Sequence, residues 1–241
     1  EAEFTAIAAT TAKSFIDKTA AAGTRYVYEV TAGDIKATEI ISRNLFFGNY
    51  EQDGNSENGK EPVEWIVVDK KDGKLLLVSK LNLDLYNIKN EYTPTTWENS
   101  DLRAWLNSEF LDNAFSAKEQ AVIVETRLEN EDNPIYGTKG GNDTTDKVFI
   151  LSSSEAQNYF GADGDRQADT SAYCSNQGSY PNSDFGTSWY WVRTPGYTSD
   201  YFAFVSGNGA LFNSGNTVDH NANAVRPAVW VDEKSVTEDE N

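Results

Sequence analysis

The carboxylates of this sequence are numerous enough to supply acid–base chemistry, but their spacing selects no catalytic pair. The chain has 38 acidic residues among 241. An acid and a base of the kind that glycosidases use could be chosen from Glu64, Glu98, Asp101 and Glu125. No Gly-x-Ser-x-Gly motif, phosphate-binding loop or cluster of metal ligands accompanies them. We therefore predict no catalytic residues, with a carboxylate-dependent enzyme acting on polysaccharides as the alternative.

A polar loop at residues 51–61 spaces its oxygen ligands as the start of a calcium loop does. Asp53, Asn55 and Glu57 alternate along it. An EF-hand loop would continue with glycine at the sixth position and glutamate at the twelfth, whereas Asn58 is sixth here and Gly59 follows. The solvated tip of a hairpin is the better interpretation. We predict no metal site and no cofactor, and calcium is the ion that stays open to test.

Sulfur and imidazole chemistry is restricted by residue counts. Cys174 is the single cysteine, so an internal disulfide and a Cys-based metal cluster are excluded. His220 is the single histidine, so no site can use two imidazoles. We expect Cys174 to be a small buried apolar residue.

The charge of the chain disfavours nucleic acid as a partner. The formal net charge is −18, which repels a phosphate backbone. From Val148 to Glu233 the basic side chains are Arg166, Arg193 and Arg226. No apolar run is long enough to span a bilayer, so we expect no membrane insertion either.

Composition divides the chain into four segments. Residues 1–4, "EAEF", resemble the remnant of a yeast secretion leader joined to a cloning site. Residues 5–33 contain "AAAGTRYVYEVTA", which resembles the later half of a fibronectin type III domain, and a linker strand is the alternative. Residues 44–232 form the main domain. Residues 233–241 are acidic, and we predict a disordered tail there.

The main domain is predicted to mix antiparallel strands with short helices. Residues 44–80 alternate in the manner of strands, and Lys71-Asp72-Gly73 is a hairpin turn. A helix is expected to start at Asn99 or Ser100, with apolar residues at helical spacing up to Phe110. A second helix begins with the capping box of Ser116 and Glu119, and a third starts near Ser153. The fold class is therefore α+β.

Several blocks of this domain resemble one family in order and spacing. They include "TTWENSDLRAWLNSEFLDNAF", "TTDKVFILSSSEAQNYF", "SWYWVRTPG" and "NAVRPAVWV". From about Leu45 to Val231 the chain is similar to DUF6273, a domain found in bacterial surface proteins that also carry fibronectin type III modules. The resemblance implies a C-type lectin-like fold with antiparallel sheets, two to three helices and long loops. It also implies a secreted or bacterial cell-surface location.

Two relatives of that fold can be weighed at the residues. Formylglycine-generating enzymes need a pair of cysteines, which this chain lacks. Calcium-dependent lectins use "EPN" or "QPD" together with "WND". The nearest matches are Glu61-Pro62-Val63, Tyr180-Pro181-Asn182 and Trp97-Glu98-Asn99, and none is a full motif.

The variable proteins of diversity-generating retroelements offer the closer parallel. They end in a W-x-W-like strand, a display region rich in Asn, Tyr, Ser and Gly, and a closing "RP" strand. Tyrosine gives rigid contact area and Asn, Ser and Gly give adaptable hydrogen bonds. The ligand-binding residues implied here are Tyr190, Tyr197, Asp200, Tyr201, Asn208, Phe212, Asn213, Asn216, Asp219, His220 and Asn223. Ordinary turn chemistry is the alternative for pairs such as Asn208-Gly209.

A second group of residues is predicted to be structural. It comprises Trp189, Trp191, Arg193, Arg226 and Trp230. A buried arginine needs a carboxylate to offset its desolvation, and Asp101 or Glu98 is expected in that role. We thus predict a monomeric, non-catalytic binding module that recognises a glycan or a protein, with a structural spacer domain as a further alternative.

Overall fold

The computed structural model describes residues 28–32, 35–39, 45–179 and 186–237, and the chain separates into two units. The first unit is Glu1–Asn44. In it, β1 (Tyr28–Ala32) pairs antiparallel with β2 (Ile35–Glu39). The proposed cloning remnant at residues 1–4 lies outside the described residues, as does most of the fibronectin-like segment.

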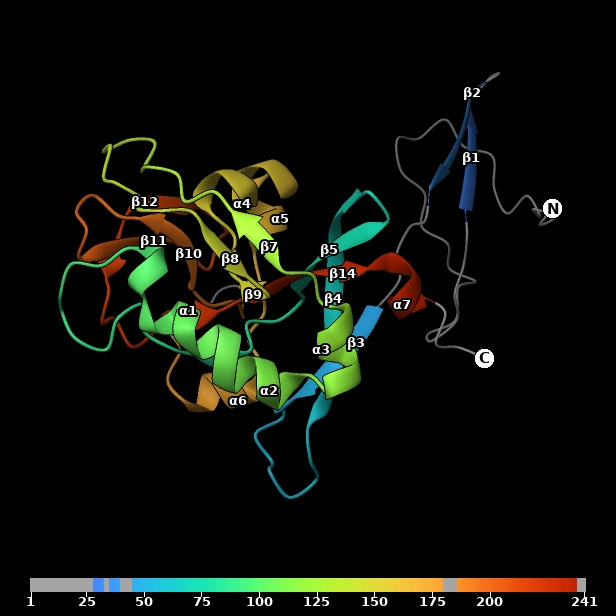
Figure 1. Cartoon of the computed structure of the whole chain (residues 1–241), viewed down its shortest axis with the longest axis horizontal. Helices are drawn as coiled ribbons and strands as arrows, with labels where there is room; N and C mark the ends of the chain where they lie inside the picture. Colours follow the sequence, from blue (N-terminus) through green and yellow to red (C-terminus); the bar gives the residue numbers. More distant parts are fainter. Residues whose placement is uncertain (1–27, 33–34, 40–44, 180–185, 238–241) are drawn as a thin grey trace. The chain divides into compact units, whose positions relative to one another are not determined.

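The second unit, Leu45–Asn241, contains two five-stranded sheets (Figure 1). The first sheet has the order β3-β4-β5-β14-β9, and all its neighbours are antiparallel. Its strands are β3 (Leu45–Tyr50), β4 (Glu61–Lys71), β5 (Lys74–Ser79), β9 (Val148–Phe149) and β14 (Ala228–Asp232). The predicted turn between β4 and β5 is confirmed, because Asp72 and Gly73 both have a positive φ, of 51° and 72°.

The second sheet has the order β12-β11-β10-β13-β6. Its strands are β6 (Asp84–Leu85), β10 (Tyr190–Pro195), β11 (Tyr201–Val205), β12 (Leu211–Thr217) and β13 (Ala224–Val225). Only the pairing of β10 with β13 is parallel among these strands. A separate ribbon joins β7 (Thr126–Leu128) to β8 (Thr144–Asp146). The fold is therefore α+β with mainly antiparallel sheets, as predicted.

The longest helical segment begins where the sequence predicted. After a short 3₁₀ turn, η1 (Trp97–Asn99), the hydroxyl of Ser100 accepts the Arg103 amide and caps the helix. The segment continues through α1 (Asp101–Trp105), the π-helical η2 (Leu106–Phe110) and α2 (Leu111–Ala114). Its apolar face is buried, as the spacing predicted.

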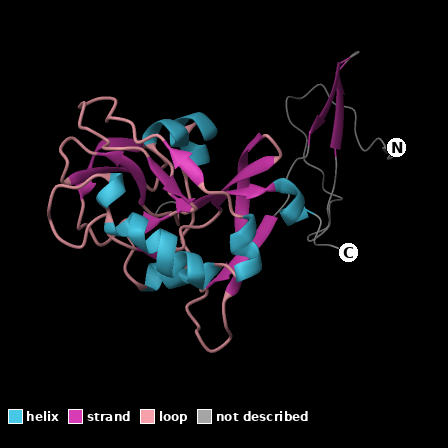
Figure 2. Ribbon diagram, viewed as in Figure 1, coloured by secondary structure: helices cyan, strands magenta, loops and turns pink. Residues whose placement is uncertain are grey.

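The remaining helices are short. The predicted capping boxes are present on α3 (Ala117–Val122) and α4 (Ser153–Tyr159), and the second of them uses Ser152 and Glu155. Three helices were missed by the sequence pattern, namely α5 (Asp163–Arg166), α6 (Ala172–Asn176) and α7 (Glu233–Thr237). Helix α7 occupies the first five residues of the segment that we predicted to be a disordered tail. Figure 2 shows these helices around the two sheets of the second unit.

The core joins both sheets through large aromatic side chains. Trp65, Trp97 and Trp191 are fully buried. Cys174 is buried as predicted, and this burial raises the pKa of its thiol to about 12. Within the residues that the structure describes, no helix has the length and the apolar character required to cross a bilayer.

Asp84 is a carboxylate buried in this core, and no cation among the described residues pairs with it. Its partners are the hydroxyl of Tyr50, the side-chain amide of Gln177 at 2.6 Å and the backbone amide of Leu85 at 2.7 Å. Burial raises its pKa above the ordinary value of 3.8, although these hydrogen bonds act in the opposite direction.

Asp84→Asn is therefore expected to change how stability depends on pH. A pKa raised in the folded state means that the stabilising contribution is complete below pH 3.8 and is lost as the pH rises through the folded value. The free energy of unfolding of the variant, minus that of the natural chain, should thus increase from pH 4 to pH 7. Urea unfolding at several pH values measures this difference. A constant difference would contradict the assignment.

Candidate functional site

Three loops meet at one end of the second sheet. They are residues 86–96, 129–143 and 196–200, and Figure 1 shows them gathered beside β11 and β12. The amide of Thr95 donates to the carbonyl of Ser199 at 2.8 Å, which joins the first loop to the third. The hydroxyl of Thr138 donates to the carbonyl of Tyr197 at 3.0 Å, which joins the second loop to the third. Segments distant in the sequence therefore form one surface.

The buried side chain of Asn133 attaches the second loop to the sheet. It is 2% exposed. Its amide nitrogen lies within hydrogen-bond distance of three backbone carbonyls, those of Pro195 at 2.6 Å, Gly196 at 3.2 Å and Asn213 at 2.8 Å. One side chain thus satisfies carbonyls from both the β10–β11 turn and β12.

The other end of the same amide shapes the loop itself. The side-chain oxygen of Asn133 accepts the backbone amides of Ile135 at 2.9 Å and Tyr136 at 3.0 Å. This is the local turn that asparagine favours. It holds Ile135 and Tyr136 outward, where they are 67% and 51% exposed.

The surface formed in this way is rich in exposed tyrosine. We call Tyr92, Tyr136, Tyr197 and Tyr201 the tyrosine patch. Tyr92 and Tyr197 are 54% and 45% exposed, and Tyr201 is half-buried. The ring centroids of Tyr197 and Tyr201 lie 4.4 Å apart at an interplanar angle of 55°, and those of Tyr136 and Tyr197 lie 6.2 Å apart at 68°. The rings therefore stand at steep angles to one another.

Asp200 adds a negative charge to the tyrosine patch. Hydrogen bonds to its carboxylate from Thr198 and then Tyr92 lower its pKa. The Tyr92 hydroxyl donates to Asp200 Oδ2 at 2.5 Å, and this bond raises the pKa of Tyr92. A hydrogen bond to Tyr201 raises the pKa of Tyr197. The patch thus places a carboxylate whose pKa is lowered beside two phenols whose pKa values are raised, those of Tyr92 and Tyr197.

Sequence reasoning named part of this surface. Tyr197, Asp200 and Tyr201 were on the predicted ligand-binding face, and the structure brings them together. Tyr92 and Tyr136 were missed because they lie in loops without a strand or helix pattern. A usable signal was present in "NPIYGT", where two bulky apolar side chains interrupt a loop that is otherwise polar and glycine-rich.

Asn208 and Phe212 lie elsewhere on the second sheet. Asn208 is in the β11–β12 turn, at the opposite end of β11 from Asp200, and its side-chain oxygen accepts the Ser206 hydroxyl at 2.6 Å. That contact is the turn chemistry considered as the alternative. Phe212 is 44% exposed and stacks on Phe204 at 5.2 Å.

Two residues predicted on the face are in the core. Tyr190 is 3% exposed and donates its hydroxyl to the carbonyl of Arg166 at 2.7 Å. Asn223 is 1% exposed and accepts from the side-chain amide of Asn216 at 3.1 Å. Neither side chain is accessible to a ligand in this structure, because β10 is covered on both faces and β13 lies between β10 and β6.

The other predicted contacts are half-buried along β12 and the turn that follows it. They are Asn213, Asn216, Asp219 and His220. The backbone carbonyl of Asn213 accepts from Asn133, and His220 stands at the edge of Trp191, with 6.4 Å between ring centroids. Asn213 thus helps to hold the loop that carries Tyr136.

The tryptophans and arginines predicted to be structural are packed in or against the core, but the predicted carboxylate partners of the arginines are wrong. Trp191 is fully buried, and Trp189 and Trp230 pack against the core. Arg193 is 3% exposed and pairs with Glu155, not with Asp101 or Glu98. The reason is topological, because α4 follows β9 directly and presents Glu155 to β10.

Arg226 uses backbone carbonyls and aromatic rings instead of a carboxylate. Its guanidinium donates to the carbonyls of Ser79 at 3.0 Å and Arg166 at 3.1 Å. It lies over the rings of Phe160 and Tyr190, at 5.0 and 5.2 Å from their centroids. Carbonyl dipoles and ring faces thus stabilise this charge.

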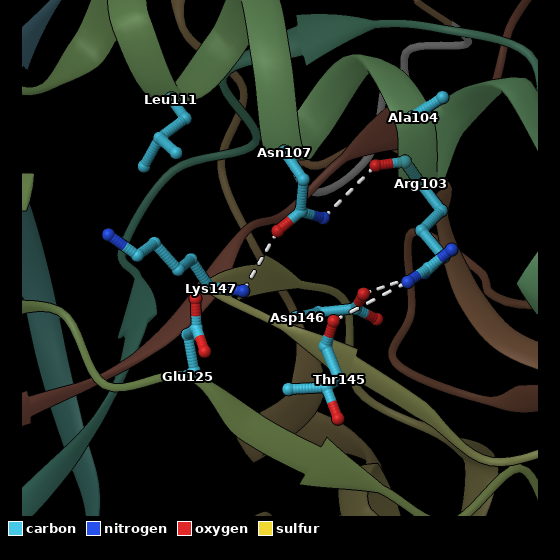
Figure 3. A pocket seen from close by; sticks show the side chains of 8 residues that line it. All are labelled: Arg103, Ala104, Asn107, Leu111, Glu125, Thr145, Asp146 and Lys147. Carbon is cyan, nitrogen blue, oxygen red and sulfur yellow. Dashed lines mark hydrogen bonds and ion pairs between the residues drawn. The ribbon is translucent and has the colours of Figure 1, made fainter.

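The four candidate catalytic carboxylates do not converge. Glu64 pairs with Lys80, Asp101 pairs with Lys89, and the carboxylate of Glu98 accepts from Asn142. Glu125 lines a cavity of about 380 Å³ beneath α1 and η2 (Figure 3).

The neighbouring carboxylate in that cavity is engaged in the fold. Figure 3 shows Asp146 facing Arg103, and their Oδ1 and Nε atoms lie 2.6 Å apart. The second oxygen of Asp146 accepts from the indole of Trp97 at 3.0 Å and from the Thr144 hydroxyl at 2.9 Å. Asp146 therefore joins the helix to the β7–β8 ribbon.

The loop tested for calcium has its own internal partners. Carboxylates of Glu51, Asp53 and Glu61 lie within 4.8 Å of one another. Their oxygens accept backbone amides of the same loop, including Gln52 to Glu61 at 2.7 Å and Gly54 to Glu51 at 2.8 Å. These hydrogen bonds order the loop of the β3–β4 hairpin.

One family model matches this chain. It is described as a domain of unknown function (DUF6273) and covers residues 72–233, more than half of the sequence. No curated protein and no solved structure matches the chain. The match begins later than the predicted start near Leu45, although β4 pairs directly with β5 in one sheet. The chain therefore belongs to the DUF6273 family.

Proposed function

We propose that this chain is a non-catalytic ligand-binding module of a secreted or cell-surface bacterial protein, which recognises a glycan or a protein through the tyrosine patch. The convergence of the three loops carries this proposal. Tyr92, Tyr136 and Tyr197 come from separate loops and are each about half exposed. Contiguous exposed aromatic groups oppose solubility and typically mark interaction sites.

Rigidity supports the same conclusion. The loops are held by the buried Asn133 and by backbone hydrogen bonds to the sheet. Tyrosine provides a large contact area at a small cost in conformational entropy, which suits a surface that binds without rearranging. The scattered positions of the candidate carboxylates favour binding over catalysis.

We also propose that the fold is C-type lectin-like, as the family resemblance implied. The last strand, β14, lies beside β5 in the sheet that also contains β3 and β4. The three loops that display the patch lie between β5 and β14 in the sequence. In this arrangement the loop-rich end is the recognition surface, and the two sheets are its support.

Binding to a glycan and peptide array tests the proposal. We expect saturable binding by the natural chain and a loss of about tenfold for Tyr197→Ala, typical of an aromatic residue at the centre of a contact. Phe46→Ala is the matched control, because Phe46 is 55% exposed on β3, in the other sheet. The array is run with calcium and again with a chelator, and we expect equal binding.

Three outcomes would contradict the proposal. The first is equal binding by Tyr197→Ala and Phe46→Ala, which would place the ligand elsewhere. The second is hydrolysis of a polysaccharide that is abolished by Glu125→Gln, which would favour the enzyme. A chain that binds nothing on either array would favour the structural spacer.

A further inference from the structure

The segment that supplies Tyr197, Asp200 and Tyr201 to this surface keeps its described arginine side chains buried. Among the described residues from 148 to 233, the basic side chains are Arg166, Arg193 and Arg226. They are 5%, 3% and 3% exposed. All three charges are therefore directed into the core and contribute little to the surface potential of the patch.

The lysines of the other two loops, residues 86–96 and 129–143, form ion pairs with aspartates. Lys89 lies 2.5 Å from Asp101, and Lys139 lies 2.6 Å from Asp132. By contrast, the side-chain partners of the Asp200 carboxylate among the described residues are the hydroxyls of Tyr92 and Thr198, which are neutral. The negative charge of Asp200 is hydrogen-bonded but is not neutralised by them.

The aromatic rings beside Asp200 add a second attraction for positive charge. The face of a tyrosine ring attracts ammonium and guanidinium groups within about 6 Å of its centroid. Tyr197 has one neighbour tilted by 55° and another by 68°, so the three rings do not form a flat platform. Rings inclined to one another, next to a carboxylate, suit a compact cation better than the flat face of a sugar.

We propose that the tyrosine patch binds a lysine or arginine side chain from a basic segment of a protein partner. This inference rests on the proposed function and names the partner's chemistry. A protein segment is favoured over an amine-bearing glycan because Ile135, 67% exposed beside Tyr136, offers an apolar contact for the residues that flank the cation. The net charge of −18 would also attract a basic partner from a distance.

The test uses a fluorescein-labelled octamer of lysine and the same octamer with every lysine acetylated. Anisotropy titrations with the full chain at 50 and 150 mM NaCl give the dissociation constants. We expect the lysine octamer to bind and the acetylated octamer to bind at least about tenfold more weakly, with affinity falling as salt increases.

Matched variants separate the patch from the overall charge. Asp200→Asn should weaken binding about threefold, the scale of an exposed ion pair. Asp72→Asn makes the same chemical change in the β4–β5 turn and should leave the affinity unchanged. Tyr197→Leu should weaken binding about threefold, whereas Tyr197→Phe keeps the ring face and should bind as the natural chain does. Equal melting temperatures confirm that each variant is folded.

Each alternative result has a definite meaning. Equal weakening by Asp200→Asn and Asp72→Asn would show attraction by net charge alone and would overturn the inference. If a glucosamine hexamer binds more tightly than the lysine octamer, the assignment of the ligand to a protein partner is wrong. If neither octamer binds while an array ligand is lost in Tyr197→Ala, the inference fails and the proposed function stands. If Tyr197→Ala changes no array signal, the proposed function itself fails.

Discussion

Asn133→Ala is expected to lower the free energy of unfolding by about 3 kcal/mol, because unpaired buried polar groups cost roughly 1–3 kcal/mol each. The change removes the donor shared by the carbonyls of Pro195, Gly196 and Asn213 and the acceptor used by two amides of the loop. Water that enters the space left by the side chain offsets part of this loss. Chemical denaturation of the variant and of the natural chain measures the difference in the free energy of unfolding.

The same variant should release the loop that carries Tyr136. Amide hydrogen exchange at Ile135 and Tyr136 should accelerate, since both amides donate to Asn133. Affinity for a patch ligand should fall with it. Asn113→Ala is the matched control, because Asn113 is exposed, and we expect less than about 0.5 kcal/mol of change there.

Asn133→Asp distinguishes the contribution of the side-chain oxygen, which it keeps, from that of the side-chain nitrogen, which it removes. An aspartate keeps an acceptor for the Ile135 and Tyr136 amides but directs negative charge toward three carbonyls. We expect slow exchange at these two amides together with reduced stability. Unchanged stability in both variants at position 133 would show that Asn133 does not attach the loop to the sheet.

Glu155→Ala is expected to cost about 3 kcal/mol of stability, the lower end of what breaking a buried ion pair costs, because the carboxylate is partly exposed. The change leaves the guanidinium of Arg193, 3% exposed, without its carboxylate. It also removes the capping box of α4, in which Glu155 accepts the Ser152 amide at 2.9 Å. The effect should extend to the patch, because Arg193 also donates to the carbonyl of Glu129, where the second loop begins.

Glu155→Gln removes the negative charge that faces Arg193 but keeps the capping box of α4. Glutamine is also accepted in a capping box and can still receive a hydrogen bond from Arg193. We expect a smaller loss of about 1–2 kcal/mol, from the missing charge alone. Thermal and urea unfolding of the two variants give the comparison. Equal losses in both would show that the cap contributes nothing.

Local features of the fold were predicted well from the sequence. The helix start at Ser100, the capping box of Ser116 with Glu119 and the turn at Asp72–Gly73 all appear in the structure. Each depends on residues within about four positions, where side-chain type and spacing decide the backbone hydrogen bonds.

Features that join distant segments were predicted less well. Arg193 was expected to pair with Asp101 or Glu98 and pairs with Glu155 instead. Tyr190 was expected on the surface and is buried. Composition indicates that an arginine needs a partner and that a tyrosine suits a surface, but it does not indicate which neighbour the sheet order will bring.

The sequence by itself determined the α+β class, the local caps and turns, the burial of Cys174 and the resemblance to the DUF6273 family. Only the tertiary structure decided that Tyr92 and Tyr136 join Tyr197 on one surface. The physical reason is the length of the connections. Asn133 bonds to a carbonyl 80 residues away, and Tyr92 to a carboxylate 108 residues away, so no local pattern encodes their meeting.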